Sequence, residues 1–190
     1  MRHLKIVLLL GLSLLAALDA GATEARLRPT EWATPVISGH LENWYKVDDR
    51  LYRSEQPDAE AMAEIEAFGI KRVLNLREYH DDDDEVEGRQ LQTFHVPIDT
   101  KQINDDDVVA ALRIILASKE PILVHCWHGA DRTGTVVAMY RIVVQGWSRE
   151  AAIDELVHGG YHYHAVFDNI ITYLKQVDIK AIRKRLKSKA

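Results

Sequence analysis

Cysteine is almost absent from this chain of 190 residues, which has a single one at position 126. A lone cysteine excludes an intramolecular disulfide framework, and it leaves no second thiol to rescue Cys126 from overoxidation. Basic residues are also few, with 24 Lys and Arg against 29 Asp and Glu and a formal net charge of −5, so general nucleic-acid binding is not expected. No repeat or low-complexity linker interrupts a composition that is typical of one globular domain.

A hydrophobic run long enough to span a membrane is missing as well. Residues 6–18 are apolar but too few to cross a bilayer comfortably, and they follow a basic start that contains Arg2 and Lys5. Small residues at 20–22 offer a cleavage site, so residues 1–22 are predicted to be a signal peptide that exports the protein, to a bacterial periplasm or out of the cell. An uncleaved N-terminal membrane anchor is the alternative. After cleavage no stable membrane span is expected.

Apolar runs that alternate with helical patterns predict an α/β fold with a central, mostly parallel sheet of about four to five strands flanked by helices. The chain divides into an extended lead-in at 23–43, one domain at 44–186 and a basic tail at 187–190. Strands are expected at 44–47, 51–54, 70–76, 93–98 and 121–124, the first two forming a hairpin. Helices are expected after the caps Asp58, Asn104 and Ser148, from Thr133 to near Gly146, and at 166–186.

The residues around the lone cysteine predict a strand, a turn and a helix in immediate succession. The loop from Cys126 to Arg132 can turn its backbone N–H groups toward one centre, where the free amides and positive dipole end of the next helix also point. Arg132 adds a planar fork of donors that matches two phosphate oxygens. Such surroundings favour a thiolate at Cys126. The stretch therefore predicts a nucleophile inside an anion-binding loop.

His125, Cys126, Arg132 and Thr133 resemble the His-Cys-x5-Arg-Thr signature of the cysteine-dependent protein tyrosine and dual-specificity phosphatases. Residues 129–134 are most similar to compact bacterial dual-specificity-type members, and the similarity extends more loosely over 44–174. The resemblance implies that Cys126 is the nucleophile and Arg132 the phosphate clamp. It also implies that the Thr133 hydroxyl eases departure of the cysteine and that His125 orients the loop and tunes the thiol. No metal or other cofactor is expected.

The loop between Cys126 and Arg132 is expected to contact the substrate. The side chain of Asp131 is not expected to point into the loop, because an inward carboxylate would oppose thiolate formation. Similar Asp-Arg-Thr-Gly loops suggest that its side chain faces out and ties the loop to a neighbouring segment. The expected substrate-binding positions of the loop are Trp127, His128, Gly129, Ala130 and Asp131.

Phosphoryl transfer to a thiolate needs a proton for the departing oxygen, and a carboxylic acid on a mobile loop beside the pocket can supply it. The resemblance places this acid just after the strand at 93–98, where Asp99 stands. Asp105, Asp106 and Asp107 are the alternatives, although acidic residues at the start of a helix also complement its dipole.

Polar residues that follow the strand at 70–76 are candidates for the pocket wall, because loops at the carboxyl ends of parallel strands line the ligand crevice. These candidates are Arg77, Tyr79 and His80, with pairing to acidic neighbours as the alternative for Arg77. The acidic run at 81–85 is expected to be a solvated loop or helix cap, and calcium binding is its alternative.

Two further segments, a group of histidines and the basic tail, can be interpreted either as structural surface features or as binding sites. The histidines at 158–164 are expected at the surface or at the pocket rim, with zinc binding as the alternative. The basic tail is expected to be a solvated end that complements the helix dipole, with attraction to anionic lipid or to a partner as the alternative.

Together these features predict a phosphatase that acts on phosphate monoesters through a cysteinyl-phosphate intermediate. The expected substrates are phosphotyrosine, and also phosphoserine and phosphothreonine, on proteins or small phosphomonoesters, and the protein is expected to be a monomer. An inositol phosphate or phosphoinositide phosphatase is the main alternative. Lysines, which relatives with that preference often carry in the loop, are absent from 127–130. More distant alternatives are a rhodanese-like sulfurtransferase and a phosphate-binding module without turnover.

Overall fold

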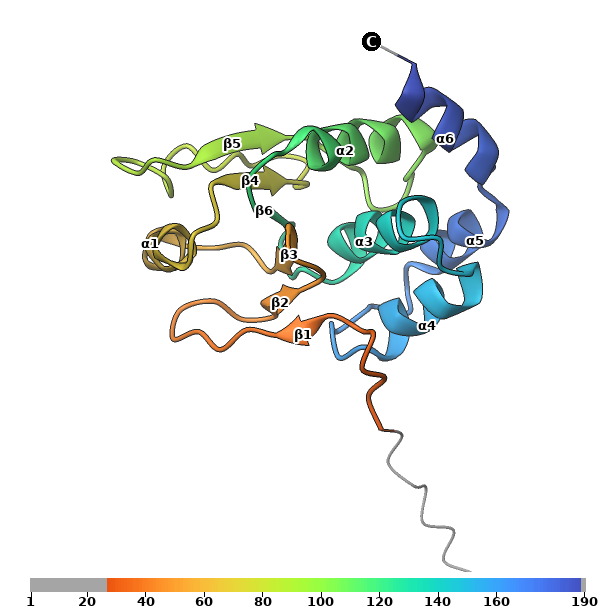
Figure 1. Cartoon of the computed structure of the whole chain (residues 1–190), viewed down its shortest axis with the longest axis horizontal. Helices are drawn as coiled ribbons and strands as arrows, with labels where there is room; N and C mark the ends of the chain where they lie inside the picture. Colours follow the sequence, from red (N-terminus) through yellow and green to blue (C-terminus); the bar gives the residue numbers. More distant parts are fainter. Residues whose placement is uncertain (1–26, 189–190) are drawn as a thin grey trace, which may run out of the picture.

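The computed structural model of the protein describes residues 27–188, which form one α/β domain around a six-stranded sheet (Figure 1). The strands are β1 (Thr34–Pro35), β2 (Tyr45–Lys46), β3 (Leu51–Ser54), β4 (Arg72–Asn75), β5 (Gln92–His95) and β6 (Ile122–His125). Their order in the sheet is β1-β2-β3-β6-β4-β5. Strands β3, β6, β4 and β5 are parallel, whereas β1 and β2 continue the β3 edge in antiparallel pairs. The mostly parallel sheet and the hairpin predicted from the sequence are therefore confirmed.

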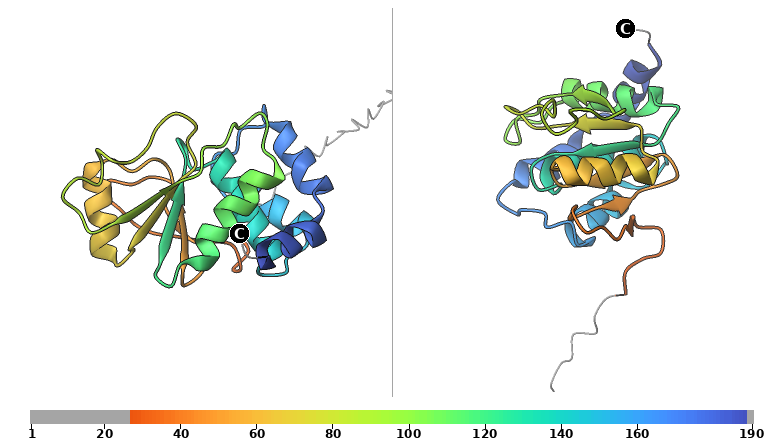
Figure 2. Two further views of the ribbon diagram at one scale, coloured as in Figure 1. Left: turned by 90° about the horizontal axis from the view of Figure 1, so that it is seen from above. Right: turned by 90° about the vertical axis from the view of Figure 1, so that its left-hand side faces the viewer.

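Helices cover both faces of the sheet. They are α1 (Ala59–Phe68), α2 (Asp105–Ala117), α3 (Asp131–Val143), α4 (Arg149–His158), α5 (Asp168–Gln176) and α6 (Ile179–Lys187). Helix α1 lies on one face, and α2 to α6 lie on the other, as the view from above in Figure 2 makes plain. The predicted caps of α1, α2 and α4 are confirmed, with side chains that accept from first-turn N–H groups: Asp58, Asn104 and Ser148.

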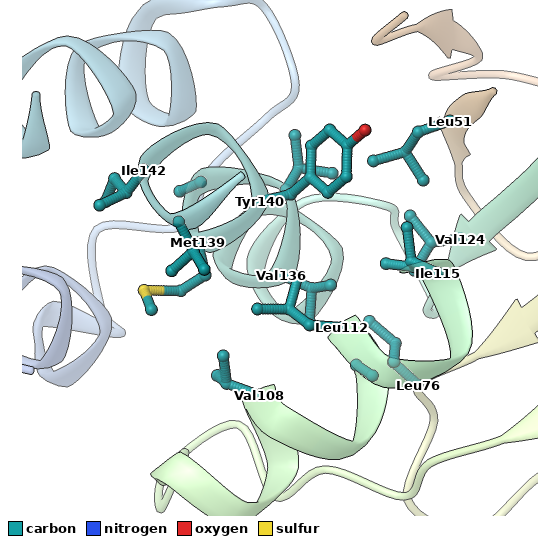
Figure 3. Packing of buried hydrophobic residues seen from close by; sticks show 14 of the residues in the cluster. Leu51, Leu76, Val108, Leu112, Ile115, Val124, Val136, Met139, Tyr140 and Ile142 are labelled. Carbon is teal, nitrogen blue, oxygen red and sulfur yellow. The ribbon is translucent and has the colours of Figure 1, made fainter. Parts of the chain in front are cut away.

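Side chains alternate between the two faces along the parallel strands, which places apolar groups on both. Tyr52, Leu123 and Val73 are in register and belong to the hydrophobic cluster that contains the buried residues of α1. Val124, one residue further along β6, belongs instead to the larger cluster with Leu112 of α2 and residues of α3 (Figure 3). Strand β6 is therefore buried on both faces, and its carboxyl end holds the start of the following loop in place.

The sheet has more strands than the four to five expected from the sequence. The additional strand is β1, in which Thr34 pairs with Lys46 and Pro35 with Tyr45. A two-residue strand is too short to produce an alternating pattern, so hydrophobic periodicity does not predict it. Other residues of the expected lead-in also pack on the domain, and Ala33 is buried.

The single helix expected at 166–186 is wrong, because the chain breaks there into α5 and α6. Val177 leaves the helical conformation with ψ 136°, and the Asp178 side chain accepts from the N–H groups of Lys180 and Ala181 to cap α6. The Arg149 guanidinium donates to the Val177 carbonyl oxygen at 2.6 Å. A cap and an arginine from another helix thus satisfy the backbone groups that a break exposes.

The predicted signal peptide at 1–22 lies outside the described residues, and so do residues 189–190 of the basic tail. Within 27–188, none of the helices is both long enough and apolar enough to cross a membrane.

Candidate active site

Cys126 directly follows β6 at the carboxyl edge of the parallel strands, and its side chain is buried. Backbone hydrogen bonds hold the chain on both sides of it. The Leu76 N–H donates to the His125 carbonyl oxygen at 2.9 Å, and the Gln56 N–H donates to the Trp127 carbonyl oxygen at 3.0 Å. The loops after β3 and β4 therefore fix the position of the cysteine between them.

Gly129 lets the loop turn close against its neighbours. Its φ is +67°, and a Cβ at this position would lie 2.3 Å from the Ser54 carbonyl oxygen, so only glycine fits. The Gly129 carbonyl oxygen accepts a hydrogen bond of 2.5 Å from the buried guanidinium of Arg53, which lies 3.7 Å from the Tyr161 ring centroid. Arg53 is thus a support of the loop that the motif did not reveal.

The first turn of α3 is open. Ala130 occupies the N-cap position, and no side chain accepts a hydrogen bond there. The turn contains Arg132, which lines the neighbouring pocket, and Thr133, whose hydroxyl oxygen is buried without a hydrogen-bond partner in residues 27–188. The helix start without a side-chain cap, the unpartnered hydroxyl and the guanidinium lie in the same turn, and an uncapped helix N-terminus is suited to binding an anion.

Asp131 turns its side chain away from this opening. Its carboxylate accepts from the His164 backbone N–H at 3.0 Å and contacts His164 Nδ1 at 2.8 Å. The side chain ties the loop to the segment that precedes α5, which is the arrangement expected from the sequence.

A pocket of about 290 Å³ opens beside the loop. Asp99 lies on its wall, and its carboxylate accepts from the Lys101 backbone N–H at 2.8 Å and from Gln102 Nε2 at 3.0 Å. The structure therefore brings Asp99 to the same pocket as Arg132. The full lining is Arg77, Glu78, Tyr79, Asp99, Thr100, Lys101, Trp127, Arg132 and Phe167.

The alternative acids lie at the start of α2 and have structural partners. Asp105 accepts from the Tyr173 hydroxyl, and Asp106 pairs with Arg185. Asp107 accepts from the Asn104 N–H in a capping box, and partial burial raises the pKa of Asp107, with smaller effects from Asp106 and Asp99. None of these three acids lines the pocket beside Arg132.

Arg77 and Tyr79 line the pocket, whereas the expectation for His80 is wrong. The Arg77 guanidinium lies 4.1 Å from the Trp127 ring centroid and donates to Gln56 Oε1 at 3.1 Å. Burial lowers the pKa of Arg77, and repulsion from Arg132 lowers it further. His80 pairs with Glu85 at 3.0 Å and is not among the lining residues.

Asp82 corrects the expectation that the acidic run at 81–85 is solvated. Its side chain is completely buried, and one carboxylate oxygen lies 2.9 Å from Nε2 of the equally buried His125. The other oxygen accepts from Gln56 Nε2 and from Asn75 Nδ2, each at 2.9 Å. Burial alone would raise the pKa of Asp82, but the contact with His125, followed by the hydrogen bond from Gln56, lowers this pKa below its ordinary value. Sequence reasoning missed Asp82 because the neighbouring aspartates look identical.

Asp82 also forms a group with His80 and Glu85 in which one ligand-type atom from each residue lies within 4.8 Å of the others. The hydrogen bonds described above already occupy both Asp82 oxygens, and His80 is bonded to Glu85. The arrangement is that of a hydrogen-bond network, and we assign no metal to it.

A second pocket, of about 370 Å³, continues from the first around Trp127 and Arg132. His128 and His164 line it with their rings 5.3 Å apart, together with the exposed Val166. His164 is therefore at the pocket rim, as one of the two interpretations of the histidines at 158–164 predicts, and His128, expected to contact the substrate, lines the same pocket. His158 is elsewhere and contacts Asp154 at 2.8 Å.

The sequence profile of the tyrosine phosphatase family matches residues 40–188. The chain belongs to this family. The dual specificity protein phosphatase TpbA of Pseudomonas aeruginosa is 33% identical over 184 residues, which cover 95% of this chain and 83% of the relative. The inositol diphosphatase DSP5 of Arabidopsis thaliana is 31% identical over 128 residues, which cover 60% of this chain and 59% of that protein.

Solved structures agree with the sequence relatives. The crystal structure of P. aeruginosa TpbA has a TM-score of 0.77 at 31% identity and covers 85% of this chain and 100% of that one. A cysteine-to-serine variant of TpbA, solved in complex with phosphotyrosine, has a TM-score of 0.75 at 30% identity, covering 84% and 98%. The resemblance stated from the sequence is confirmed, and the protein is a phosphatase of the tyrosine and dual-specificity type.

Proposed function

We propose that this phosphatase hydrolyses phosphotyrosine in proteins with Cys126 as nucleophile and Asp99 as proton donor. The Cys126 thiolate attacks phosphorus and forms an S–P bond, while the bond from phosphorus to the ester oxygen breaks and Asp99 protonates that oxygen. Water then attacks the phosphocysteine with Asp99 as base, the S–P bond breaks, and phosphate leaves. Arg132 and the loop amides hold the phosphoryl oxygens in both steps, and the Thr133 hydroxyl stabilises the departing thiolate.

The observation that carries this proposal is the open first turn of α3. Cys126 directly follows β6 and begins the loop that leads into this turn, Arg132 and the unpaired Thr133 hydroxyl belong to the turn, and Asp99 lines the same pocket as Arg132. A sulfurtransferase or a phosphate-binding module would have no use for a carboxylic acid at that position, so Asp99 favours hydrolysis.

Aromatic side chains around the pocket support phosphotyrosine as the substrate. Trp127 and Tyr79 are exposed at the pocket, and Phe167 completes its wall. A phenol ring that leads into the anion site can stack on such groups, and aromatic pairs contribute about 0.5–1.5 kcal/mol beyond their buried area. The TpbA variant, similar along most of the chain, was solved with phosphotyrosine.

The test is phosphate release from a panel of substrates, with a chelator present throughout. The panel contains a phosphotyrosine peptide, the matched phosphothreonine peptide and an inositol hexakisphosphate solution. We expect the highest kcat/KM for the phosphotyrosine peptide and no loss of activity in chelator. Preference for either other substrate overturns the choice of phosphotyrosine, and inactivation by chelator overturns the metal-free mechanism.

An inositol polyphosphate is the second candidate, because three cationic side chains share the pocket. Arg77 and Lys101 lie on its wall with Arg132, and repulsion from Arg132 adds to burial in lowering the pKa of Arg77. A ligand with several phosphates relieves this repulsion. If it is the substrate, Lys101→Ala should lower kcat/KM at least about fivefold for it and less than twofold for phosphotyrosine. The exposed Lys119, outside this pocket, provides the control Lys119→Ala.

We also propose that the protein acts outside the cytoplasm as a monomer, after removal of residues 1–22. The basic start, the short apolar run and the small residues at 20–22 support export. N-terminal sequencing of the protein recovered from the extracytoplasmic fraction should begin at residue 23. An intact N-terminus in the membrane fraction would favour the anchor instead, and light scattering of the mature form tests the monomer.

A further inference from the structure

Both ring nitrogens of His125 face oxygen atoms that can only accept. Nε2 lies 2.9 Å from the Asp82 carboxylate, and Nδ1 lies 3.3 Å from the Cys126 carbonyl oxygen. A neutral imidazole has one donor and one acceptor nitrogen, so it would leave one of these contacts repulsive. Only the doubly protonated ring donates to both oxygens.

Asp82 is equipped to hold that positive charge in the interior. The side chains of both residues are completely shielded from solvent, and a buried charge needs a partner and hydrogen bonds. The second carboxylate oxygen of Asp82 accepts from Gln56 and Asn75, which fixes its orientation. Asn75 is the last residue of β4 and pairs in register with His125 of β6, so the sheet itself sets this geometry.

The same network reaches the pocket wall. The Gln56 amide donates to Asp82 through its nitrogen and accepts from the Arg77 guanidinium through its oxygen at 3.1 Å. Arg77 in turn covers Trp127 of the loop. Asp82 therefore contacts His125, the residue before Cys126. Through Gln56 it is also linked to Arg77, which stacks on Trp127, the residue after Cys126.

We propose that Asp82 is a positioning residue that keeps His125 doubly protonated, so that a fixed positive charge beside Cys126 favours its thiolate. This inference rests on the proposed role of Cys126 as nucleophile. Cysteine next to a charged histidine is a strong thiolate environment. The side chain of Asp82 forms its hydrogen bonds with Gln56, Asn75 and His125, and Asp82 is not among the residues that line the pocket.

Other charged side chains also interact with Cys126 and Asp82 and would remain after a substitution of Asp82. The guanidiniums of Arg53 and Arg77 both interact electrostatically with Cys126. His80 interacts with Asp82, and Arg77 interacts with Asp82 and Glu85. Replacing Asp82 leaves these charges in place, so the expected effect is a shift of thiolate formation rather than its loss.

The single cysteine makes the test direct, because alkylation of the chain by iodoacetamide reports on Cys126 alone. The alkylation rate of the folded protein is measured from pH 4 to 9 for wild type and Asp82→Asn. We expect the pH of half-maximal rate to rise by about one unit in the variant. We expect kcat/KM at neutral pH to fall about tenfold, with its acidic limb displaced upward by the same amount. An unshifted alkylation profile overturns the proposal, even if the variant is less stable.

Asp83→Asn is the matched control, because it removes the same charge from the adjacent, exposed residue. Its alkylation profile should follow wild type. A comparable shift in this variant would mean that the general acidity of the loop acts on Cys126, which contradicts the proposal. In a His125→Asn background, Asp82→Asn should cause no further shift, since Asp82 acts through His125.

A measurement on the wild-type enzyme covers the case in which Asp82→Asn does not fold. The ¹⁵N chemical shifts of the His125 ring, assigned by their loss in His125→Asn, report the protonation of both nitrogens. Two protonated nitrogens at pH 7 support the proposal, and one unprotonated nitrogen overturns it. Alkylation and ring protonation involve no substrate, so this test can fail while the phosphatase proposal stands. Inactivity toward every substrate in the panel, in turn, leaves this test unaffected.

Discussion

Helices α2 and α3 have the same length and both start with an acidic residue after a parallel strand, yet their N-termini differ in one respect. At α2 the Asn104 side chain accepts from the N–H groups of Asp106 and Asp107, and Asp107 accepts from the Asn104 N–H. At α3 the cap is Ala130, which has no side chain to accept a hydrogen bond. The chain closes one helix end with its own side chains and leaves the other open.

The comparison explains why a count of acidic residues misleads. The three acids of the α2 start belong to the helix cap and to pairs with distant residues, so they stabilise the fold. The single acid of the α3 start, Asp131, is turned toward His164 and leaves the opening to an anion. What identifies the candidate site is therefore a helix start without a side-chain cap close behind Cys126, whereas the side-chain cap of α2 identifies a structural helix end.

The largest effect is expected from Cys126→Ser, which keeps the open helix end but removes the nucleophile. Hydrolysis should fall by about 10,000-fold or more, because the substituted hydroxyl lacks a base that would activate it. Binding of a phosphotyrosine peptide should stay within about threefold of wild type, because Arg132 and the amides remain. Calorimetry on the variant and phosphate release measure the two. Retained turnover would show that another group attacks phosphorus.

A large effect on folding is expected from Gly129→Ala, which pushes a methyl group against the Ser54 carbonyl oxygen at a positive φ. The free energy of unfolding should fall by about 3 kcal/mol, from strain plus the clash. Gly146→Ala is the control, because Gly146 has φ +77° and an open surrounding, so strain alone costs about 1 kcal/mol there. Urea unfolding of both variants measures the difference. Equal losses would mean that the loop can move away from Ser54.

Asp99→Asn tests whether Asp99 or an acid at the start of α2 supplies the proton to the leaving oxygen. We expect kcat to fall about 100-fold for phosphotyrosine but less than about tenfold for an activated aryl phosphate, whose leaving oxygen needs little help. Asp106→Asn, at the exposed α2 start, should leave both rates unchanged. Equal slowing of both substrates by Asp99→Asn would transfer the acid role to Asp105 or its neighbours, and Asp107→Asn would then be the next variant to measure.

The active-site loop could be predicted because its information is local. Cys126, Arg132 and Thr133 stand within eight residues, and an apolar run before them and a helical period after them set the strand, turn and helix. The family resemblance placed the acid just after the strand expected at 93–98. The observed strand β5 ends at His95, and the chain that follows it brings Asp99 to the wall of the pocket that Arg132 lines. The sheet direction followed from strands that alternate with helices.

The supports of the loop depend on contacts that spacing does not encode. Asp82 lies 43 residues from His125, and nothing in the run of four aspartates marks it as the buried one. Arg53 lies 76 residues from Gly129. Side chains two residues apart in a strand lie on the same face, so Arg53 shares a face with the buried Leu51. This pattern could have indicated that the Arg53 side chain points into the interior. The only sequence feature that indicates the break between α5 and α6 is Asp178, a residue type that often caps a helix.

The smallest effect is expected from Asn104→Ala, which opens the α2 start without creating a site there. Loss of the cap should lower the free energy of unfolding by about 1 kcal/mol. Because the Asn104 side chain bonds to Gln102, Asp106 and Asp107, which belong to the α2 start and its preceding turn, kcat/KM should stay within about twofold of wild type. Ser148→Ala, which removes the equivalent cap of α4, is the matched control for stability. A selective loss of kcat/KM in Asn104→Ala would mean that the closed helix end positions Asp99, and the two ends would then belong to one site.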